Sequence, residues 1–339
     1  MPAQSPGKNL TQRSMFQPRN RPAAYQALLA IALVLSAWYF VSNAVENLRA
    51  RHIASGFGFL TREAGFEIGE TAFIAYSAGD TYLRALAVGL CNTFYVAALA
   101  ILFSTVIGVA LGFARLSPNW LLAHLAAAYV EFIRNLPLVV QLFFCYALIT
   151  ESLPAPAQAL CPVPGIFLSN RGLALPSLIS LVPLKIELPI LNGFNFSGGA
   201  LLSPEFAALF IGLTLYTAAF IGEIVRAGIL AVDRGQFEAA QSLGLSDRQV
   251  MRLIVLPQAL RVIVPPTTGQ YLNCIKNSSL AVAIGYPDLV SIANTAINQT
   301  GQAIEGIAII MLVYLTISLA ISAVMNWYNA RIALKGAGA

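Results

Sequence analysis

Few side chains in this sequence have the type and spacing that a catalytic or metal-binding site needs. His52 and His124 are isolated from each other and from any carboxylate cluster, so the sequence favours neither a metal site nor a Ser/His/Asp hydrolase. No GxxxxGKS or GxxxxGKT phosphate loop occurs. The cysteines have no CxxC or CxxH spacing, and three fall in apolar runs, which is typical of buried thiols: Cys91, Cys145, Cys161 and Cys274. The sequence therefore predicts no catalytic site, no metal and no cofactor bound by this chain.

Two pairs of opposite charges lie three residues apart within apolar stretches. Glu223 precedes Arg226, and Glu131 precedes Arg134 at the same spacing. Because residues three apart share one face of a helix, each acid can satisfy its neighbouring arginine. Both are therefore predicted to be structural ion pairs, with substrate contact as the less favoured interpretation.

A polar group, Lys276, Asn277 and Ser278, interrupts another apolar run. An ionisable residue at such a place is a candidate for a transport pathway. The alternative is a lysine whose long side chain reaches the membrane surface. The sequence leaves both interpretations open.

The composition indicates an integral membrane protein. Of 339 residues, 58% are hydrophobic and only 10% are charged, whereas soluble domains are about a quarter charged. The mean hydropathy of +0.72 agrees. The net charge of +5 comes from basic residues in connectors that flank apolar segments, which reports membrane orientation and not a nucleic-acid partner.

The amino-terminal half divides into a tail, an anchor, a connector and two further spans. Residues 1–22 form a basic disordered tail, and 23–42 are predicted to be a retained transmembrane helix, because the apolar run is longer than a signal-peptide core. The mixed-charge connector 43–85 is placed on the external side of the membrane. The next two spans cover 87–113 and 121–150.

Prolines and glycines shape these spans. Pro137 should kink the helix over 121–150 and face protein, because the backbone groups that it frees need partners inside the membrane. Gly89, Gly108 and Gly112 are predicted to allow close helix packing.

The carboxyl-terminal half begins with a Pro-rich insert, 151–203, which is interpreted as external or re-entrant. A span over 172–191 is disfavoured by its charges and prolines. Spans follow at 204–229, at 261–285, where Pro265 and Pro266 are tolerated in a first turn, and at 304–326. The loop 230–257 between the first two of these spans, and both termini, are placed in the cytoplasm.

The cytoplasmic loop has the local design of two short helices at a bend. Asp233 with Gln236 can cap the first helix, and Ser246 with Gln249 makes a capping box for the second. Gly244 supplies the left-handed residue that ends the first helix. A loop that merely connects two spans would explain these caps equally well.

The spacing within this loop is more specific than its caps. Ala239, Ala240 and Gly244 are predicted to form a small-residue surface that another protein can approach closely. Glu238-Ala239-Ala240, Gly244 and Ile254-Val255-Leu256-Pro257 resemble, at every position, the EAA signature of ABC-importer permeases. The resemblance implies that an ATPase docks on Glu238, Ala239, Ala240, Leu243, Gly244, Leu245, Ile254 and Pro257.

Two further segments, 132–143 and 276–280, look like the corresponding helices of polar amino-acid permeases of the histidine and glutamine type. This resemblance covers a permease domain over 86–334, apart from the insert. The additional first span and the insert are similar to those of the larger permease subunits of general L-amino-acid importers. The implied fold is all-α, the type I importer permease fold, with about six and up to eight transmembrane helices.

The resemblance implies an importer subunit in a bacterial inner membrane. Its partners would be a second permease, a pair of ATPases that hold ATP and Mg, and a periplasmic amino-acid-binding protein. A second permease that differs from this chain is favoured over an identical copy. Alternating access would then carry the substrate. An amino acid is a zwitterion, and seven side chains are candidates to meet its charges: Asn92, Thr93, Gln141, Asn273, Lys276, Asn277 and Ser278.

Two other functions compete with this prediction. An ion-coupled secondary amino-acid transporter would also place polar groups among spans, but it needs no docking loop. A membrane-embedded enzyme is disfavoured because the charged pairs come with no nucleophile, metal cluster or cofactor motif.

Overall fold

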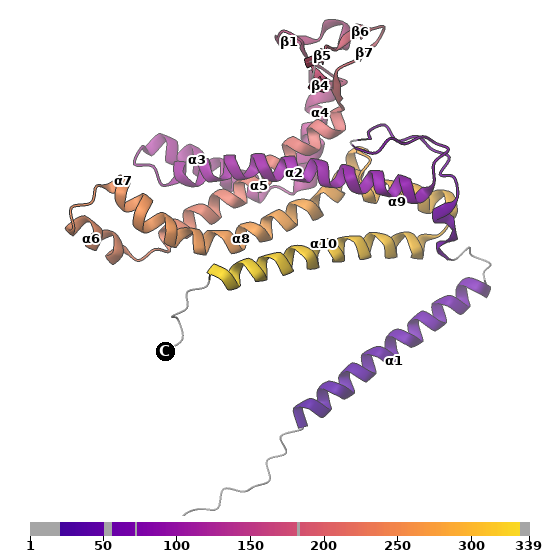
Figure 1. Cartoon of the computed structure of the whole chain (residues 1–339), viewed down its shortest axis with the longest axis horizontal. Coiled ribbons are helices and arrows are strands. Elements are labelled where there is room, and N and C mark those ends of the chain that lie inside the picture. Colours follow the sequence, from indigo (N-terminus) through magenta and orange to yellow (C-terminus); the bar gives the residue numbers. More distant parts are fainter. Residues whose placement is uncertain (1–20, 51–55, 72, 182–183, 333–339) are drawn as a thin grey trace, which may run out of the picture. The chain divides into compact units, whose positions relative to one another are not determined.

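The computed structural model describes residues 21–50, 56–71, 73–181 and 184–332 and divides the chain into two units, 1–55 and 56–339 (Figure 1). The first unit holds one helix, α1 (Arg21–Ala50), of which Tyr25–Asn43 is long and apolar enough to cross a membrane. The predicted tail 1–22 lies almost entirely outside the described residues. The second unit contains every other helix and strand described below.

Two long helices form the centre of the second unit. These are α2 (Tyr82–Arg115) and α5 (Pro204–Leu230). They approach closely because a Cβ on Gly108 would lie 2.6 Å from the Ile221 Cβ, and a Cβ on Gly112 would lie 2.6 Å from the Val225 Cβ. Glycine therefore lets the two backbones pack without intervening side chains, which confirms the packing role predicted for these glycines.

The apolar stretch around Pro137 is two helices and not one kinked helix. α3 (Trp120–Asn135) and α4 (Leu138–Ser152) meet at 106°. Leu136 between them is extended, with φ −94° and ψ 134°, because a residue that precedes proline is pushed out of the helical region. The predicted kink is thus corrected to a break.

The proline-rich insert folds into short antiparallel strands, which the sequence analysis did not predict. A four-stranded sheet has the order β1-β2-β3-β8, and β4–β5 and β6–β7 are separate hairpins. Gly165 and Gly193 have positive φ at the tips of the β1–β2 and β6–β7 hairpins, where a left-handed residue allows the tight turn. The strand bounds are Leu160–Val163 (β1), Ile166–Ser169 (β2), Gly172–Leu175 (β3), Ser177–Leu181 (β4), Leu184–Glu187 (β5), Ile190–Asn192 (β6), Asn195–Ser197 (β7) and Ala200–Leu202 (β8).

After α5 the chain forms the loop helices α6 (Arg234–Ser242) and α7 (Asp247–Val250). A π-helical turn, Met251–Val255, leads directly into α8 (Leu256–Asn277). Pro265 and Pro266 consequently lie inside α8 and not in its first turn, which corrects the predicted start of this span. The apolar pattern already begins before Leu256, and Pro257 takes the first-turn position.

The carboxyl-terminal part continues with a 3-10 helix, Ser278–Ile284, then α9 (Leu289–Thr300) and α10 (Ala303–Ile332). Figure 1 shows α6 and α7 at one end of the bundle, whereas α9 lies at the other. Within the described residues, five helices are long and apolar enough to span a membrane, or six if the bent pair α3–α4 counts as one span.

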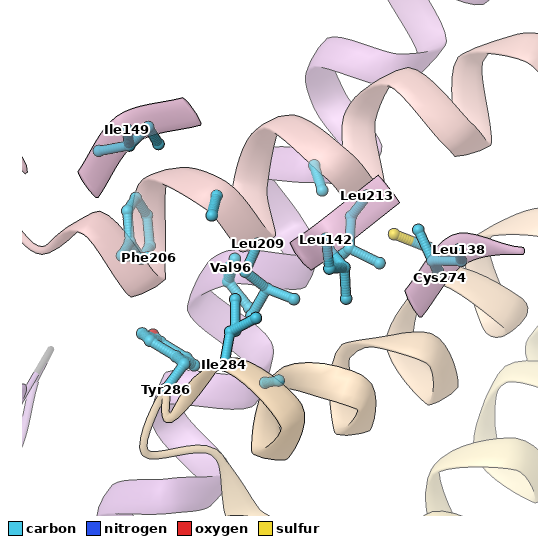
Figure 2. Packing of buried hydrophobic residues seen from close by; sticks show 13 residues of the cluster. Val96, Leu138, Leu142, Ile149, Phe206, Leu209, Leu213, Cys274, Ile284 and Tyr286 are labelled. Carbon is cyan, nitrogen blue, oxygen red and sulfur yellow. The ribbon is translucent and has the colours of Figure 1, made fainter. Parts of the chain in front are cut away.

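The largest buried cluster joins α2, α4, α5 and the turn after α8 (Figure 2). Leu142, Leu209 and Leu213 are fully buried there, and Tyr286 closes the cluster at the turn. A second cluster packs the connector before α2 on α9, through Phe59 and Ala64 of the connector, Tyr82 of α2, and Leu289 and Ile292 of α9. The connector is therefore folded onto the end of the bundle that α9 occupies.

Candidate functional site

Local hydrogen bonds build the two-helix loop as its sequence predicts. Asp233 caps α6 by accepting a hydrogen bond from the Gly235 N–H at 2.7 Å. The Ser246 N–H donates to the Gln249 Oε1 at 3.0 Å, and the two residues form a capping box. Both helices are thus held by their own side chains and need no partner protein to form.

A left-handed glycine forms the bend between α6 and α7. Gly244 has φ +80°. Its N–H donates to the Gln241 carbonyl at 2.9 Å, and the Leu245 N–H donates to the Ala240 carbonyl at 3.3 Å. These two bonds make a Schellman motif, in which any residue with a Cβ would be strained. The bend is therefore specified by one residue.

The outer face of the loop is exposed and carries one acid. Leu243 is 83% exposed, and the Glu238 side chain is 68% exposed. The Glu238 Oε1 lies 3.5 Å from the Arg234 Nε, which is a weak surface pair. Ala239, Gly244 and Pro257 are also exposed. This face therefore exposes small and apolar groups around an acid.

Ala240 does not belong to that surface. Its side chain is only 4% exposed and packs in a cluster with Val225 and Ile229 of α5 and with Val250 and Val255. The helical period of α6 turns Ala239 outward and Ala240 inward, so the predicted role of Ala240 in a contact surface is corrected to an anchoring role. Leu245 and Ile254 are half-buried around the same cluster.

A cavity of about 530 Å³ lies beside the exposed face. Phe237, Glu238 and Gln241 of α6 line one wall, and Ile229 and Met251 line another. Its walls combine apolar side chains with the Glu238 carboxylate. An exposed face beside a cavity of this kind is suited to contact with another protein.

A group of three charges lies where α2 and α5 approach this loop. The Glu223 Oε1 accepts from the Arg226 Nη2 at 2.6 Å, and the Glu223 Oε2 accepts from the Arg226 Nε at 3.2 Å. Arg115, the last residue of α2, also donates to Glu223. The ion pair expected within α5 therefore extends to a second helix.

The similar pair in α3 is not formed. Within the described residues no ion pair joins Glu131 to Arg134, and the Arg134 guanidinium lies 5.1 Å from the centre of the Phe220 ring on α5. A cation over an aromatic face is itself stabilising. The expected structural ion pair is corrected to a contact between α3 and α5.

Two of the candidate substrate residues hold a turn against α2. Asn92 is fully buried, and its Nδ2 donates to the Pro287 carbonyl at 2.9 Å. Thr93 is also buried, and its Oγ1 accepts from the Leu289 N–H at 3.1 Å. Their polar atoms are engaged with the backbone, which is a structural use of these side chains.

Of the other five candidates, two also hydrogen-bond to the backbone through their side chains, and three show no such bond within the described part of the chain. The Gln141 amide donates to the Ile133 carbonyl at 2.9 Å and bridges the break at Pro137, and the buried Ser278 hydroxyl donates to the Ile275 carbonyl at 2.7 Å. Asn277 is half-buried, whereas Asn273 and Lys276 are exposed on α8. The structure of this single chain does not bring the seven residues together in one cavity.

Asp288, the N-cap residue of α9, is a buried acid to which no sequence pattern assigns a role. Asp288 is fully buried, and its Oδ1 accepts from the Ser291 N–H at 2.8 Å, which caps α9. Burial raises the pKa of this carboxyl to about 7. The sequence Gly285-Tyr286-Pro287-Asp288 is typical of a break between helices, but no local pattern in it indicates that its acid is buried.

Metal chemistry has no candidate in the part of the chain that the structure describes. There, no three side chains of the types His, Cys, Asp or Glu are close enough together to hold an ion.

Comparison with protein families gives one match over most of the chain. Residues 104–334 match the family model described as binding-protein-dependent transport system inner membrane component. The matched segment contains the loop helices α6 and α7, the charged group at Glu223 and the spans α5, α8 and α10.

Curated relatives extend the similarity to almost the whole chain. The chain is 46% identical to the putative amino-acid ABC transporter permease protein YhdX of Escherichia coli (strain K12), with 95% of this chain and 96% of that protein covered. It is 41% identical to the general L-amino acid transport system permease protein AapQ of Rhizobium johnstonii, with 95% and 94% covered. These matches confirm the predicted resemblance to the permeases of amino-acid ABC importers.

Solved structures support the helical core. A chain in the crystal structure of an amino acid ABC transporter with histidines is similar with a TM-score of 0.55 and 26% identity, covering 74% of this chain and 95% of that one. A chain of the MetNI methionine ABC transporter in an inward-facing conformation matches with a TM-score of 0.51 at 16% identity, covering 74% and 98%, which bears on the fold alone.

Proposed function

The chain belongs to the family of binding-protein-dependent transport system inner membrane components, and we propose that it is the permease subunit of an ATP-driven amino-acid importer. Its relatives at 41% and 46% identity are named as amino-acid permeases. The same relationship disfavours an ion-coupled secondary transporter. Polar or general L-amino acids are the proposed substrates.

The observation that carries the proposal is the exposed loop at the end of α5. Glu238 is exposed on α6, and Leu243 and Gly244 are exposed in the bend that follows it. The loop is capped by its own side chains and anchored to the bundle through Ala240. In this proposal an ATPase contacts that face and the cavity beside it. ATP and Mg are bound by the ATPase pair and not by this chain.

The anchoring gives a route from the loop to the spans. Ala240 packs against Val225 of α5, and the Glu223 group ties α5 to the end of α2. Because packed side chains and ion pairs transmit a displacement as a unit, movement of the docked loop would shift α5 together with α2. That coupled shift is the proposed switch between outward and inward states.

Membrane orientation follows from α5. We place the loop 230–257 in the cytoplasm, where the ATPase is. Since α5 is one unbroken membrane-length helix, its start at Pro204, the strand insert before it and the folded connector then lie outside. Both termini are proposed to be cytoplasmic, in a bacterial inner membrane.

The remaining partners are a second permease and an external amino-acid-binding protein. A heterodimer of permeases is preferred. Asn273 and Lys276 lie on an exposed face of α8, next to the unobstructed Gly269, and that face is the proposed side toward the second permease and the substrate pathway.

The test is to purify the tagged chain from its native membrane in mild detergent, identify its companions by mass spectrometry, and reconstitute the complex in liposomes with ATP inside. An ATPase and a second permease should be recovered, and uptake of labelled amino acids should require both ATP and the external binding protein. Uptake that continues without ATP but follows an ion gradient would contradict the proposal.

A further inference from the structure

Two adjoining cavities lie at the end of the bundle away from the loop 230–257, the coupling loop of the proposed function. The larger, of about 430 Å³, is lined by the connector residues 66–70, the start of α5 and the segment from Gly285 to α9. The smaller, of about 210 Å³, lies between Glu70 and the strands β2, β3, β7 and β8. Gly69, Glu70 and Ser203 line both, so the two cavities share one wall.

Glu70 is held firmly in that shared wall. Its Oε1 accepts from the Ser203 N–H at 3.1 Å, and its backbone carbonyl accepts from the Asn92 Nδ2 at 2.9 Å. Burial, more than the nearby Glu205, raises the pKa of the Glu70 carboxyl. The Glu70 carboxylate is half-buried in this wall, and a cation that enters the cavity beside it favours its charged form.

Arg171 supplies the opposite charge in the smaller cavity. It lies in the two-residue turn between β2 and β3, which its own N–H helps to form by donating to the Ser169 Oγ at 3.3 Å. Among the described residues that line the two cavities, Arg171 is the single cationic side chain, and no ion pair joins it to an acid. Its guanidinium is therefore available to a bound carboxylate.

We propose that these cavities form an external binding site for a free α-amino acid, with its ammonium at Glu70 and its carboxylate at Arg171. Arginine recognises a carboxylate through two parallel hydrogen bonds, and a carboxylate pairs with an ammonium. A drug-sized ligand needs about 300–1,000 Å³. The smaller cavity suits the charged backbone atoms of an amino acid, and the larger one receives its side chain.

This site rests on the proposed function for its place in transport. On the orientation proposed above it lies outside the membrane, on the side from which the substrate comes. The insert and the connector supply its two charges, so the site gives the strand insert a purpose in substrate capture.

The experiment measures binding of labelled L-glutamine to the purified chain in lipid nanodiscs, without an ATPase. Arg171→Gln and Glu70→Gln are the variants, and Glu70→Gln keeps an oxygen for the Ser203 N–H. Arg62→Gln and Glu63→Gln are matched controls, since both residues are exposed in the connector and line neither cavity. Each variant should weaken binding about tenfold or more, and the controls should bind as the parent chain does.

Ligand analogues assign each charge. The parent chain should prefer L-glutamine to L-glutaminamide, which lacks the carboxylate, and to N-acetyl-L-glutamine, which lacks the ammonium. Arg171→Gln should lose only the first preference, and Glu70→Gln only the second. Absence of saturable binding to the parent chain, or unchanged affinity in both variants, would overturn the site.

The outcome separates the site from the proposed function. If the assembled transporter imports amino acids with an unchanged KM in both variants, the site is refuted and the import function stands. If the chain binds L-glutamine through these residues but ATP drives no uptake, the import function fails and the site stands.

Discussion

The Arg115 guanidinium donates a hydrogen bond to the Glu223 carboxylate, although 108 residues separate them in the chain. Arg115 ends α2, and Glu223 lies in α5 one turn before its other partner, Arg226. The three charges thus connect the two central helices close to the coupling loop.

Glu223→Gln should lower the free energy of unfolding by roughly 1–3 kcal/mol, because it leaves two partly buried arginines without their anion. Thermal unfolding in detergent measures this loss of stability. The matched control is Glu131→Gln, whose acid has the same spacing to an arginine without forming a pair, and it should stay within about 0.5 kcal/mol. If Arg115→Gln and Glu223→Gln have strictly additive effects when combined, the two residues do not interact as described.

Gly244→Leu should reduce ATP-driven uptake at least about tenfold while ATP hydrolysis continues, because a Cβ strains the left-handed bend by roughly 1–2 kcal/mol and displaces the loop surface. Uptake and phosphate release in proteoliposomes measure the two activities.

Gly301→Leu is the control for Gly244→Leu. Gly301 ends α9 with φ +73° and, like Gly244, has no neighbouring atom within 4 Å of its built Cβ, but it lies outside the loop. It should cost similar stability and leave hydrolysis and uptake coupled. Equal loss of coupling in both variants would argue against docking at the loop.

Gly108→Ala should destabilise the protein by roughly 1–3 kcal/mol, since its Cβ would lie 2.6 Å from the Ile221 Cβ and force α2 and α5 apart. Combining it with Ile221→Ala should recover part of the loss. Gly269→Ala, which meets no atom within 4 Å, is the control and should be nearly neutral. Thermal unfolding distinguishes these outcomes, and equal effects of the two glycine substitutions would refute close packing at Gly108.

Asp288 should make stability depend on pH. Its folded pKa of about 7 lies above the ordinary aspartate value, so the folded state binds a proton more readily than the unfolded state. The resulting stabilisation is complete below about pH 4 and is lost as the pH rises through about 7. Asp288→Asn keeps an acceptor for the Ser291 N–H and should flatten this slope.

Asp80 is the control for the measurement of stability against pH, because its pKa is shifted in the opposite direction to that of Asp288. The hydrogen bond from the Ser77 backbone holds the pKa of Asp80 below its ordinary value, so its contribution is present at neutral pH and is lost on acidification. Asp80→Asn should therefore change the acid side of the profile and leave the slope near pH 7 intact. A profile that is insensitive to Asp288→Asn would contradict enclosure of that carboxyl.

Much of the coupling loop could be predicted because its interactions are local. The caps at Asp233 and Ser246 and the left-handed Gly244 involve partners within a few residues, and the structure shows each of them. The long apolar spans were equally visible in the sequence, since a run of about 20 apolar residues has few alternatives to a membrane helix.

Partners across the fold could not be predicted in this way. Arg134 has an acid three residues away in the sequence, yet its guanidinium lies over the Phe220 ring. Arg115 instead pairs with Glu223, which is 108 residues away in the sequence. The inward turn of Ala240 and the enclosure of Asp288 likewise depend on which helices pack beside them.

The sequence by itself determined the membrane class, most of the spans and the loop that identifies the family, because hydropathy, caps and spacing act over short stretches of chain. Only the tertiary structure decided the 106° break at Pro137, the strands of the insert and the position of Glu70 and Arg171 around one cavity. The physical reason is that these features depend on packing and pairing between segments far apart in the chain. The energy of such contacts depends on both segments together, so a local sequence pattern does not predict it.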